Sequence, residues 1–406
     1  MKRLLAFSFY DVGNSVFPMI VISALTSSYF VNHVSNDPQT GTALWQLTIG
    51  ISGIFVAMVM PYFGNLADSL KNGRLIFLRL FTALCITSIF LFWFILPSSN
   101  YIFFTLIILF FGSISYETSN GFYNSTLKNC SSSNLTLSSG VGFGSGYLGG
   151  VIILLVLLQN FVLPEEKLFD ISTENQTHLR FVHIILALWF LIFSIPLLFF
   201  CKFDNENPES IKKTTVKIKD LIWNNGLTNT GRFLFARMLY ADGLVIVTTG
   251  IGIFGTAVIG LSIKEILVVA IIANISGALG CYVYGILFKN DKKIIIFNLL
   301  LLIIIVVGIS TSKTPMQFIV LTIIGTFFSG PLQSSSRVVM AALTSNQSQG
   351  FGFGMFTLSG KITAFIGPIL AGILTFLFSQ RIGFGFSIVL LTTGLFFMMK
   401  VSYKDS

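Results

Sequence analysis

Charged residues are scarce in this chain. Only 10% of its 406 residues are Asp, Glu, Lys or Arg, whereas soluble domains carry about 25%. Histidine and cysteine are also rare, with 3 and 4 copies, and they do not cluster with the spacing of a metal site. The sequence has no G-x-S-x-G, HExxH or phosphate-binding loop motif. The scarcity of charge argues against a soluble globular protein. From the other absences we expect no metal, no cofactor and no enzymatic activity.

What the chain has instead is long apolar runs. Its residues are 54% hydrophobic, with 43 phenylalanines, and the mean hydropathy is +0.84. The runs are roughly 20 residues long, which suits membrane helices rather than the strands of about ten residues found in a membrane barrel. We predict an all-α integral membrane protein with twelve spans, at about 7–31, 42–63, 74–96, 101–126, 139–162, 179–201, 232–258, 263–288, 293–311, 315–341, 350–378 and 382–400.

The distribution of Lys and Arg predicts the orientation, because cytoplasmic loops are enriched in these residues. If the N-terminus is cytoplasmic, the cytoplasmic segments hold sixteen of them and the opposite segments hold five. We therefore expect both termini in the cytoplasm, no cleavable signal peptide, and a place in the inner membrane of a bacterial-type cell. The same bias explains the net charge of +9 without a nucleic-acid partner. The sixteen are Lys2, Arg3, Lys71, Arg74, Lys128, Lys202, Lys212, Lys213, Lys217, Lys219, Arg232, Lys289, Lys292, Lys293, Lys400 and Lys404.

One long polar stretch divides the spans six and six. We predict an N-terminal half at 1–201, a cytoplasmic linker at 202–231 and a C-terminal half at 232–406. Short similarities recur at equivalent places, such as FYDVG at 9–13 and LYADG at 239–243. An internal parallel repeat of six helices is the organisation of many secondary transporters.

The loop between the second and third spans carries a more specific signal. Gly64, Asp68, Gly73 and Arg74 resemble the loop signature G-x-x-x-D-x-x-G-R/K of the major facilitator superfamily. In that family the aspartate engages a helix end and basic partners to latch the closed state. Here the spacing from Asp68 to Gly73 is longer and only one basic residue follows, so an ordinary capped turn is the alternative.

We single out six ionisable residues inside the predicted spans, where a charge near the bilayer centre costs on the order of 3 kcal/mol. Such groups pair, face the bundle interior or line a water-filled path. Helices 1, 4, 7 and 10 line the cavity of a major facilitator, and five of the six would lie there. The candidates are Asp11 in helix 1, Glu117 in helix 4, Arg237 and Asp242 in helix 7, Arg337 in helix 10 and Lys361 in helix 11.

Helix 4 carries a polar and aromatic stripe. Tyr116, Asn120, Tyr123 and Asn124 share one helical face, and Glu117 lies beside it. Packing against lipid explains such a stripe poorly. For the asparagines, hydrogen bonding between helices is the alternative to ligand contact.

Helices 10 and 11 each carry one basic residue. Gln333 and Arg337 share a face of helix 10, and an arginine fork suits a carboxylate or phosphate. An anchor at the membrane surface is the alternative for Arg337. We expect Gly330 and Pro331 to weaken helix 10 beside the cavity. For Lys361 we expect an ion pair with a carboxylate of a neighbouring helix, a gating role, or both.

Several blocks carry a family resemblance along most of the chain. FYDVGNSVF (9–17) resembles the opening block of the vacuole-effluxer-like branch of the major facilitator superfamily. YETSNGFYNSTL (116–127) and SGVGFGSGYLGG (139–150) resemble its helix 4 and 5 blocks. RMLYADG (237–243), GPLQSSSRVVMAAL (330–343) and FGMFTLSGKITAFIGP (353–368) resemble its helix 7, 10 and 11 blocks. Val12 departs from the tryptophan that is frequent there, and the loop KNCSSSN at 128–134 lacks the expected acidic and arginine residues.

This resemblance implies a transporter of twelve helices in two pseudo-symmetric halves, with amino-acid efflux as the associated activity. We expect alternating access, a monomer, and proton coupling through Asp11 or Glu117, with Asp242 as a third candidate. Arg237 or Arg337 would hold a substrate carboxylate. Neutral hydrogen bonds would come from Tyr10, Asn14, Tyr116, Asn120, Tyr123, Asn124, Tyr240 and Gln333. Carriers for peptides, nucleosides or organic phosphates are the alternative, followed by a membrane receptor or scaffold that does not transport.

Overall fold

The computed structural model describes residues 2–131, 134–164, 168–201 and 213–402. Within these ranges the chain is helical, and the one pairing of extended residues is an isolated bridge between Trp223 and Leu227. Twelve of the described helical segments are long and apolar enough to cross a membrane. The predicted fold class, an all-α membrane protein with twelve spans, is therefore confirmed. Residues 202–212 of the predicted linker lie outside the described residues, as do Lys404 and Lys167, which is one of the five basic residues expected on the opposite side.

The first six spans form one bundle, which we call the N bundle. Its elements are α1 (Lys2–Asn14), η1 (Phe17–Ile22), α2 (Leu25–Tyr29), η2 (Phe30–Val34), α3 (Pro38–Ser69), α4 (Gly73–Leu91), η3 (Phe92–Phe94), η4 (Ser99–Tyr101), α5 (Ile102–Ser125), α6 (Leu127–Cys130), α7 (Leu135–Leu157), η5 (Leu158–Val162), η6 (Leu168–Asp170), η7 (Glu174–Gln176) and α8 (Thr177–Phe200). Within it, α1 packs against α7 and α8, and α5 packs against α3 and α4.

The last six spans form the C bundle, which follows the short helix α9 (Thr214–Ile222). Its elements are α10 (Asn229–Ala257), α11 (Ile263–Leu287), α12 (Asp291–Thr311), α13 (Pro315–Leu343), η8 (Asn346–Ser348), α14 (Gln349–Lys361), α15 (Ile366–Leu377) and α16 (Gln380–Met399). Here α10 and α12 both pack along α16, and α13 packs against α11 and α12.

Local sequence explains where several of the helices begin. Asp37 caps α3 by accepting a hydrogen bond from the Thr40 backbone N–H, and Pro38 follows at the first helical position. A capping box of Ser262 and Glu265 begins α11. Large apolar side chains such as Phe376, which is 88% exposed, cover the outside of the bundles. A surface this apolar is suited to lipid.

The helices differ from the sequence prediction at two places. The helix α13 continues through Gly330 and Pro331 without a break. The span expected at 350–378 is instead divided into α14 and α15, with residues 362–365 between them. In this gap Ala364 N donates to Lys361 O at 3.3 Å and Ile366 N donates to Thr363 O at 2.7 Å, so the helical hydrogen-bond pattern is lost. The consequence is an irregular backbone within the eleventh span.

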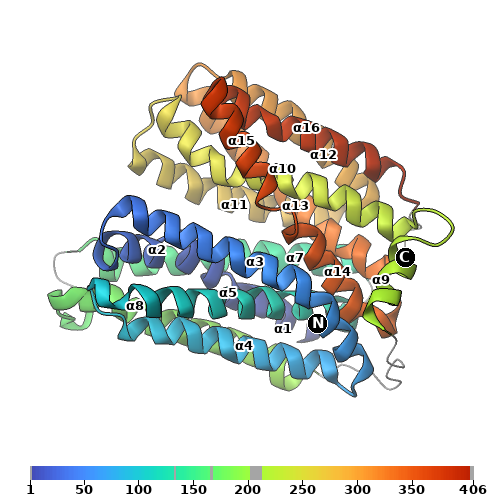
Figure 1. The fold of residues 1–406 in the computed structure, drawn as a ribbon, viewed down its shortest axis with the longest axis horizontal. Coiled ribbons are helices and arrows are strands. Elements are labelled where there is room, and N and C mark those ends of the chain that lie inside the picture. The colour runs from blue at the N-terminus through green and yellow to red at the C-terminus, as the bar shows by residue number, and fades with distance from the viewer. Residues whose placement is uncertain (1, 132–133, 165–167, 202–212, 403–406) are drawn as a thin grey trace.

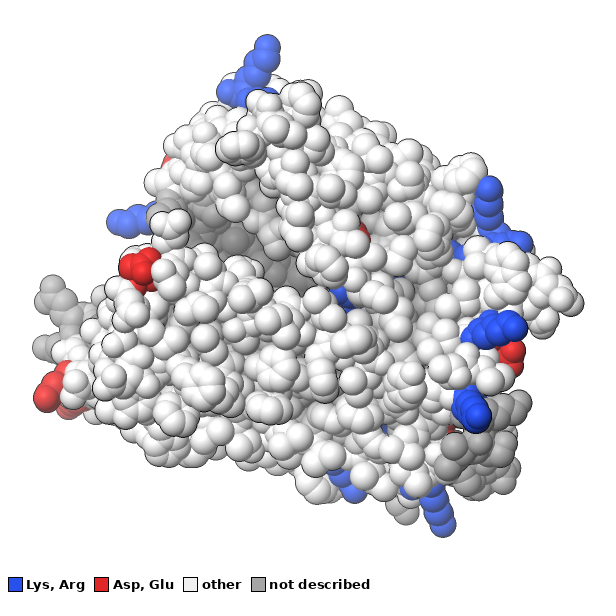
Figure 2. Space-filling view, in the orientation of Figure 1, with Lys and Arg blue, Asp and Glu red and all other residues white. Residues whose placement is uncertain are grey.

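The two bundles meet along α3 and α14, α5 and α14, α7 and α11, and α7 and α13. In Figure 1 the N bundle lies below the C bundle, and both chain ends lie at the right-hand end of the molecule. We call this end the termini end. Figure 2 shows a hollow between the bundles toward the opposite end, while most of the visible Lys and Arg side chains lie toward the termini end. The bundles are therefore closed together at one end and separated at the other.

Candidate functional site

A buried ion pair joins the two bundles. Asp11 of α1 and Arg337 of α13 approach to 3.5 Å between Oδ2 and Nη1. The Tyr123 hydroxyl of α5 donates to the same Asp11 oxygen at 2.6 Å. Asp11 is 8% exposed and Arg337 is 1% exposed. Three residues that the sequence analysis singled out on different helices therefore converge at one contact.

Arg337 also binds groups that come from two more positions of the N bundle. Its Nη1 donates to Asn124 Oδ1 at 3.0 Å. Its Nε and Nη2 donate to the Ser139 hydroxyl and carbonyl oxygens, each at 2.9 Å. The guanidinium lies 4.4 Å from the centre of the Phe143 ring and 5.0 Å from that of Phe7. The charge is thus compensated by the carboxylate, by neutral oxygens and by aromatic faces.

Gly142 of α7 makes room for this contact. A Cβ atom at position 142 would lie 2.6 Å from Asp11 Oδ2 and 3.1 Å from Arg337 Nη2. Real Cβ atoms do not approach a carboxylate oxygen so closely. The glycine therefore allows α7 to pack directly on the ion pair.

A second ion pair between the bundles is more open to solvent. Lys361 Nζ at the end of α14 lies 2.7 Å from Glu117 Oε1 of α5, with side-chain exposures of 34% and 20%. Partial exposure makes such a pair cheap to break and re-form. The expected ion pair of Lys361 is therefore present and links helices that belong to different bundles, while its gating role stays a prediction.

At the termini end, the Asp68 carboxylate of α3 binds the start of α14. It accepts from the backbone N–H groups of Gly350 at 3.0 Å and Phe351 at 2.7 Å, and from Arg74 Nε at 2.8 Å. Arg74 Nη2 in turn donates to the Asn346 carbonyl at 2.6 Å. The N-terminus of a helix carries positive potential, so it suits this carboxylate. The loop-signature residues thus fasten the N bundle to the C bundle.

The other predicted arginine lies within one bundle. Arg237 of α10 donates to the Phe356 carbonyl at 2.7 Å and to the Ser359 hydroxyl at 2.9 Å, both on α14. Its guanidinium lies 3.4 Å from the centre of the Phe356 ring. These contacts hold the end of α14 against α10. Of the two predicted arginines, only Arg337 lies between the bundles.

The remaining predicted residues are spread over both bundles. The Tyr10 hydroxyl pairs with Thr82 at 2.6 Å, and the Tyr240 hydroxyl pairs with Ser336 at 2.7 Å, each within its own bundle. Tyr116 stacks on Phe17 with ring centres 5.1 Å apart. The side-chain nitrogen of Asn14 is buried without a hydrogen-bond partner among the described residues. Asn120 is half-buried and Gln333 is exposed.

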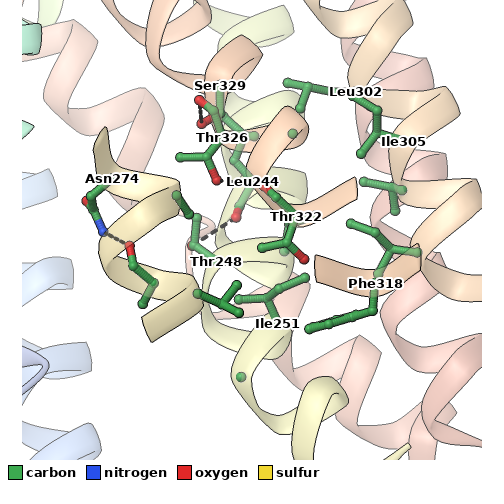
Figure 3. A pocket seen from close by; sticks show the side chains of 18 of the residues that line it. Leu244, Thr248, Ile251, Asn274, Leu302, Ile305, Phe318, Thr322, Thr326 and Ser329 are labelled. Carbon is green, nitrogen blue, oxygen red and sulfur yellow. Dashed lines mark hydrogen bonds between the residues drawn. The ribbon is translucent and has the colours of Figure 1, made fainter. Parts of the chain in front are cut away.

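A cavity of about 330 Å³ opens among α10, α11, α12 and α13, with Tyr147 of α7 contributing from the N bundle. Figure 3 shows its polar side chains, among them Thr248, Asn274 and Thr326, spaced among apolar ones. Gln333 lines the cavity one helical turn from Arg337. No charged side chain belongs to the described lining. Of the predicted binding residues, Gln333 is the one that reaches this cavity.

Sequence reasoning missed several of these residues. Ser139, Gly142 and Phe143 lie within the block quoted at 139–150, which is part of α7. None of them was assigned a role in the sequence analysis. Thr136 of α7, which donates to Asp291 Oδ2 at 2.7 Å across the bundles, was also missed. The signal that could have found them is the density of Gly and Ser in 138–150, which predicts close helix packing.

The sequence is similar to those of one family of membrane proteins. A family profile described as "Vacuole effluxer Atg22 like" matches residues 128–406. The "Uncharacterized MFS-type transporter YxiO" of Bacillus subtilis (strain 168) is 24% identical over 397 residues, which cover 94% of this chain and 90% of that protein. "Autophagy-related protein 22-1" of Aspergillus fumigatus is 23% identical over 282 residues, which cover 59% of this chain and 43% of that protein.

Solved structures show the same fold. The human organic anion transporter MFSD10 (TETRAN) superimposes with a TM-score of 0.76 at 13% identity, over 98% of both chains. The transporter FucP in the outward conformation gives a TM-score of 0.74 at 12% identity, over 100% of this chain and 99% of that chain. FucP is a major facilitator superfamily transporter, and these likenesses show the same fold for the present chain.

Proposed function

The chain belongs to the vacuole effluxer Atg22-like family of major facilitator transporters, and on this premise we propose that it moves an amino acid or a related small polar metabolite by alternating access coupled to protons. Its activity is therefore transport, with no catalytic step. We further propose that it works as a monomer, with two halves at 1–201 and 232–406 joined by a linker at 202–231.

The observation that carries this proposal is the position of Arg337. It comes from the C bundle, yet its guanidinium is bound by Asp11, Asn124 and Ser139 of the N bundle. A contact of this kind must break when the bundles separate at the termini end. A substrate carboxylate can replace the oxygens of Asp11 and Asn124, because a guanidinium binds carboxylates in a bidentate geometry.

The state of the structure supports alternating access. The bundles are fastened at the termini end by Asp68 and the start of α14, while the hollow opens at the other end. The bias of Lys and Arg toward the termini end favours a cytoplasmic location for that end. With this orientation the hollow between the bundles faces away from the cytoplasm. We propose the cytoplasmic membrane of a bacterial-type cell as its location and efflux as its direction.

Uptake into proteoliposomes tests the function. The purified full-length chain is reconstituted, and each standard amino acid, radiolabelled, is offered outside the liposomes with and without an outward proton gradient (acidic inside), because proton-driven efflux exchanges the substrate against protons. We expect one chemical class of amino acid to accumulate above equilibrium only with the gradient, and a protonophore to abolish the accumulation. Empty liposomes are the control for leakage. Protein that is shown to be folded but carries no amino acid in any condition would contradict the substrate class.

Arg337→Lys sharpens this test. It keeps the positive charge but removes the planar fork, so we expect uptake of the accepted amino acid to fall at least tenfold. Lys71→Gln, in an exposed loop of the termini end, is the matched control and should leave uptake unchanged. Equal uptake by Arg337→Lys and the wild type would remove Arg337 from substrate binding.

A further inference from the structure

We propose that Asp242 of α10, facing the interruption between α14 and α15, is the group that binds and releases the coupling proton. This inference rests on the proposed function and narrows it, since the sequence left three carboxylates as candidates. Irregular backbone within a membrane helix is tolerated where it is buried in protein or lines a path, and coupling ions bind at such places in other transporters.

The other two carboxylates are already paired. Asp11 is bound by Arg337 and by the Tyr123 hydroxyl, and Glu117 is bound by Lys361. A cation balances the charge of each of these two carboxylates. Their partners lie on the opposite bundle, which suits them for holding the bundles together.

Asp242 differs from both. It is 5% exposed, and its Oδ1 is buried without a hydrogen-bond partner in the described part of the chain. Burial of an unpaired carboxylate in a membrane protein is costly, and a bound proton removes most of that cost. The polar neighbour of this carboxylate is Thr363, in the helix interruption. Thr363 Oγ1 is likewise buried without a partner of ordinary hydrogen-bond geometry among the described residues.

No cation neutralises Asp242 from the elements packed against it, as far as the structure describes them. Lys361 and Arg337 are bound to the N bundle, Arg237 is bound to α14, and Arg381 of α16 donates to the Ser310 carbonyl. The titratable side chains on these elements are Arg232, Arg237 and Tyr240 of α10, Lys361 of α14, Arg337 of α13, Lys264, Glu265, Cys281, Tyr282 and Tyr284 of α11, Lys217, Lys219 and Asp220 of α9, and Arg381 and the adjacent Lys400 of α16, with none on α15.

The interruption is held against α10 on both sides of the gap. Before it, Arg237 binds the Phe356 carbonyl and the Ser359 hydroxyl. After it, α15 begins so close to α10 that a Cβ at Gly367 would lie 3.2 Å from the Asp242 carbonyl oxygen. Asp242 therefore lies where a change in its charge acts on the join between α14 and α15.

The helix α14 connects this join to the closure of the termini end. Its first residues bind Asp68, and its last residue, Lys361, binds Glu117. A proton on Asp242 allows its carboxyl group to donate to Thr363 or to a backbone carbonyl of the interruption, and α14 can then shift as one unit. Proton binding at Asp242 is thereby linked to the contacts that must open during transport.

Infrared spectroscopy of the purified full-length protein tests the proton site without a substrate. The C=O band of a buried protonated carboxyl group is recorded while the pH is raised. We expect a band that titrates in the wild type, disappears in Asp242→Asn, and persists in Asp11→Asn, Glu117→Gln and the exposed control Asp220→Asn. Persistence of the band in Asp242→Asn, or its loss in Asp11→Asn or Glu117→Gln instead, would overturn the assignment. A band that responds to Na⁺ rather than to pH would overturn it as well.

Proteoliposomes give the functional arm. For the amino acid with the largest wild-type exchange, we expect Asp242→Asn to keep exchange within about twofold and to lose accumulation driven by a proton gradient. Retained exchange also shows that the variant is folded. Thr363→Val should shift the pH at which the infrared band titrates, because it removes the neighbouring hydroxyl. Gradient-driven accumulation by Asp242→Asn equal to that of the wild type would refute the proposal while leaving the transport function intact.

Discussion

Asp11 and Arg337 meet across the two bundles with 3.5 Å between Oδ2 and Nη1, although 326 positions separate them in the chain. The pair is buried, and each member has further neutral partners from the N bundle. Removing one member of a buried pair leaves an uncompensated charge, which costs roughly 3–5 kcal/mol. The contact is consequently well suited to stabilise the state that is closed at the termini end.

The first prediction follows from this geometry. Asp11→Asn and Arg337→Gln should each lower the melting temperature of the purified protein and move spin labels apart at the termini end. The double variant should lose less than the sum of the two, because neither charge is then left alone. A thermal-unfolding cycle with electron–electron distance measurements checks this, with Asp220→Asn as the control. Additive effects in the cycle would show that the two charges do not interact.

Gly142 provides a steric test of the same contact. In Gly142→Ala the new Cβ would lie 2.6 Å from Asp11 Oδ2, so the ion pair or α7 must shift. We expect a lower melting temperature and a loss of transport of at least tenfold. Gly372→Ala is the matched control, since a Cβ at that glycine meets nothing within 4 Å. Equal behaviour of the two variants would mean that α7 moves without cost.

A comparison of variants at Arg74 and Lys71 distinguishes the contacts that close the termini end from the overall charge of the loop that carries both residues. Arg74→Gln removes the donors to Asp68 and to the Asn346 carbonyl. We expect it to raise the reactivity of a cysteine introduced at the closed interface toward a water-soluble maleimide. Lys71→Gln changes the same loop charge at an exposed position and should leave the reactivity as it was. If both variants raise the reactivity of the introduced cysteine equally, the loss of one positive charge from the loop, and not the loss of the Arg74 hydrogen bonds, would explain the effect.

Glu117 and Lys361 allow a charge exchange. Because both are partly exposed, their pair contributes at most about 1 kcal/mol to stability, so single variants should melt close to the wild type. Transport should suffer more, because the pair forms and breaks between the bundles. Glu117→Lys and Lys361→Glu should each reduce uptake at least fivefold, and the double exchange should restore part of it. An exchange no better than either single variant would argue that position, not charge pairing, matters.

The sequence predicted the twelve spans because apolar runs of membrane length are an unambiguous signal. It also named both members of each ion pair, since charges inside spans stand out. Their partners could not be assigned, because the contacts join Glu117 to Lys361 and Asp11 to Arg337 across two bundles whose mutual placement depends on tertiary packing. Small residues such as Ser139 and Gly142 were missed for the same reason.

The helix interruption was expected in the wrong span for a physical reason. Pro331 has no N–H for the Phe327 carbonyl, which predicts a weakened helix. In the structure a side chain at Gly280 of α11 would collide with that carbonyl, so the helices pack closely there and α13 stays continuous. The break falls instead at 362–365, where Pro368 follows and α14 is already held at both of its ends.

Two adjacent threonines on α10 test whether the cavity in the C bundle receives the substrate. Thr248 lines the cavity and Thr249 does not, although both are exposed and both donate to backbone carbonyls of the preceding turn. Thr248→Phe fills part of the 330 Å³ space, so we expect the apparent affinity for the transported amino acid to fall at least tenfold. Thr249→Phe adds the same ring one position along and should keep uptake within twofold of the wild type. Saturation kinetics in proteoliposomes distinguish the two, because a ring that only disturbs the helix would lower the maximal rate in both variants. Unchanged affinity in Thr248→Phe would place the substrate outside this cavity, nearer to the N bundle and Arg337.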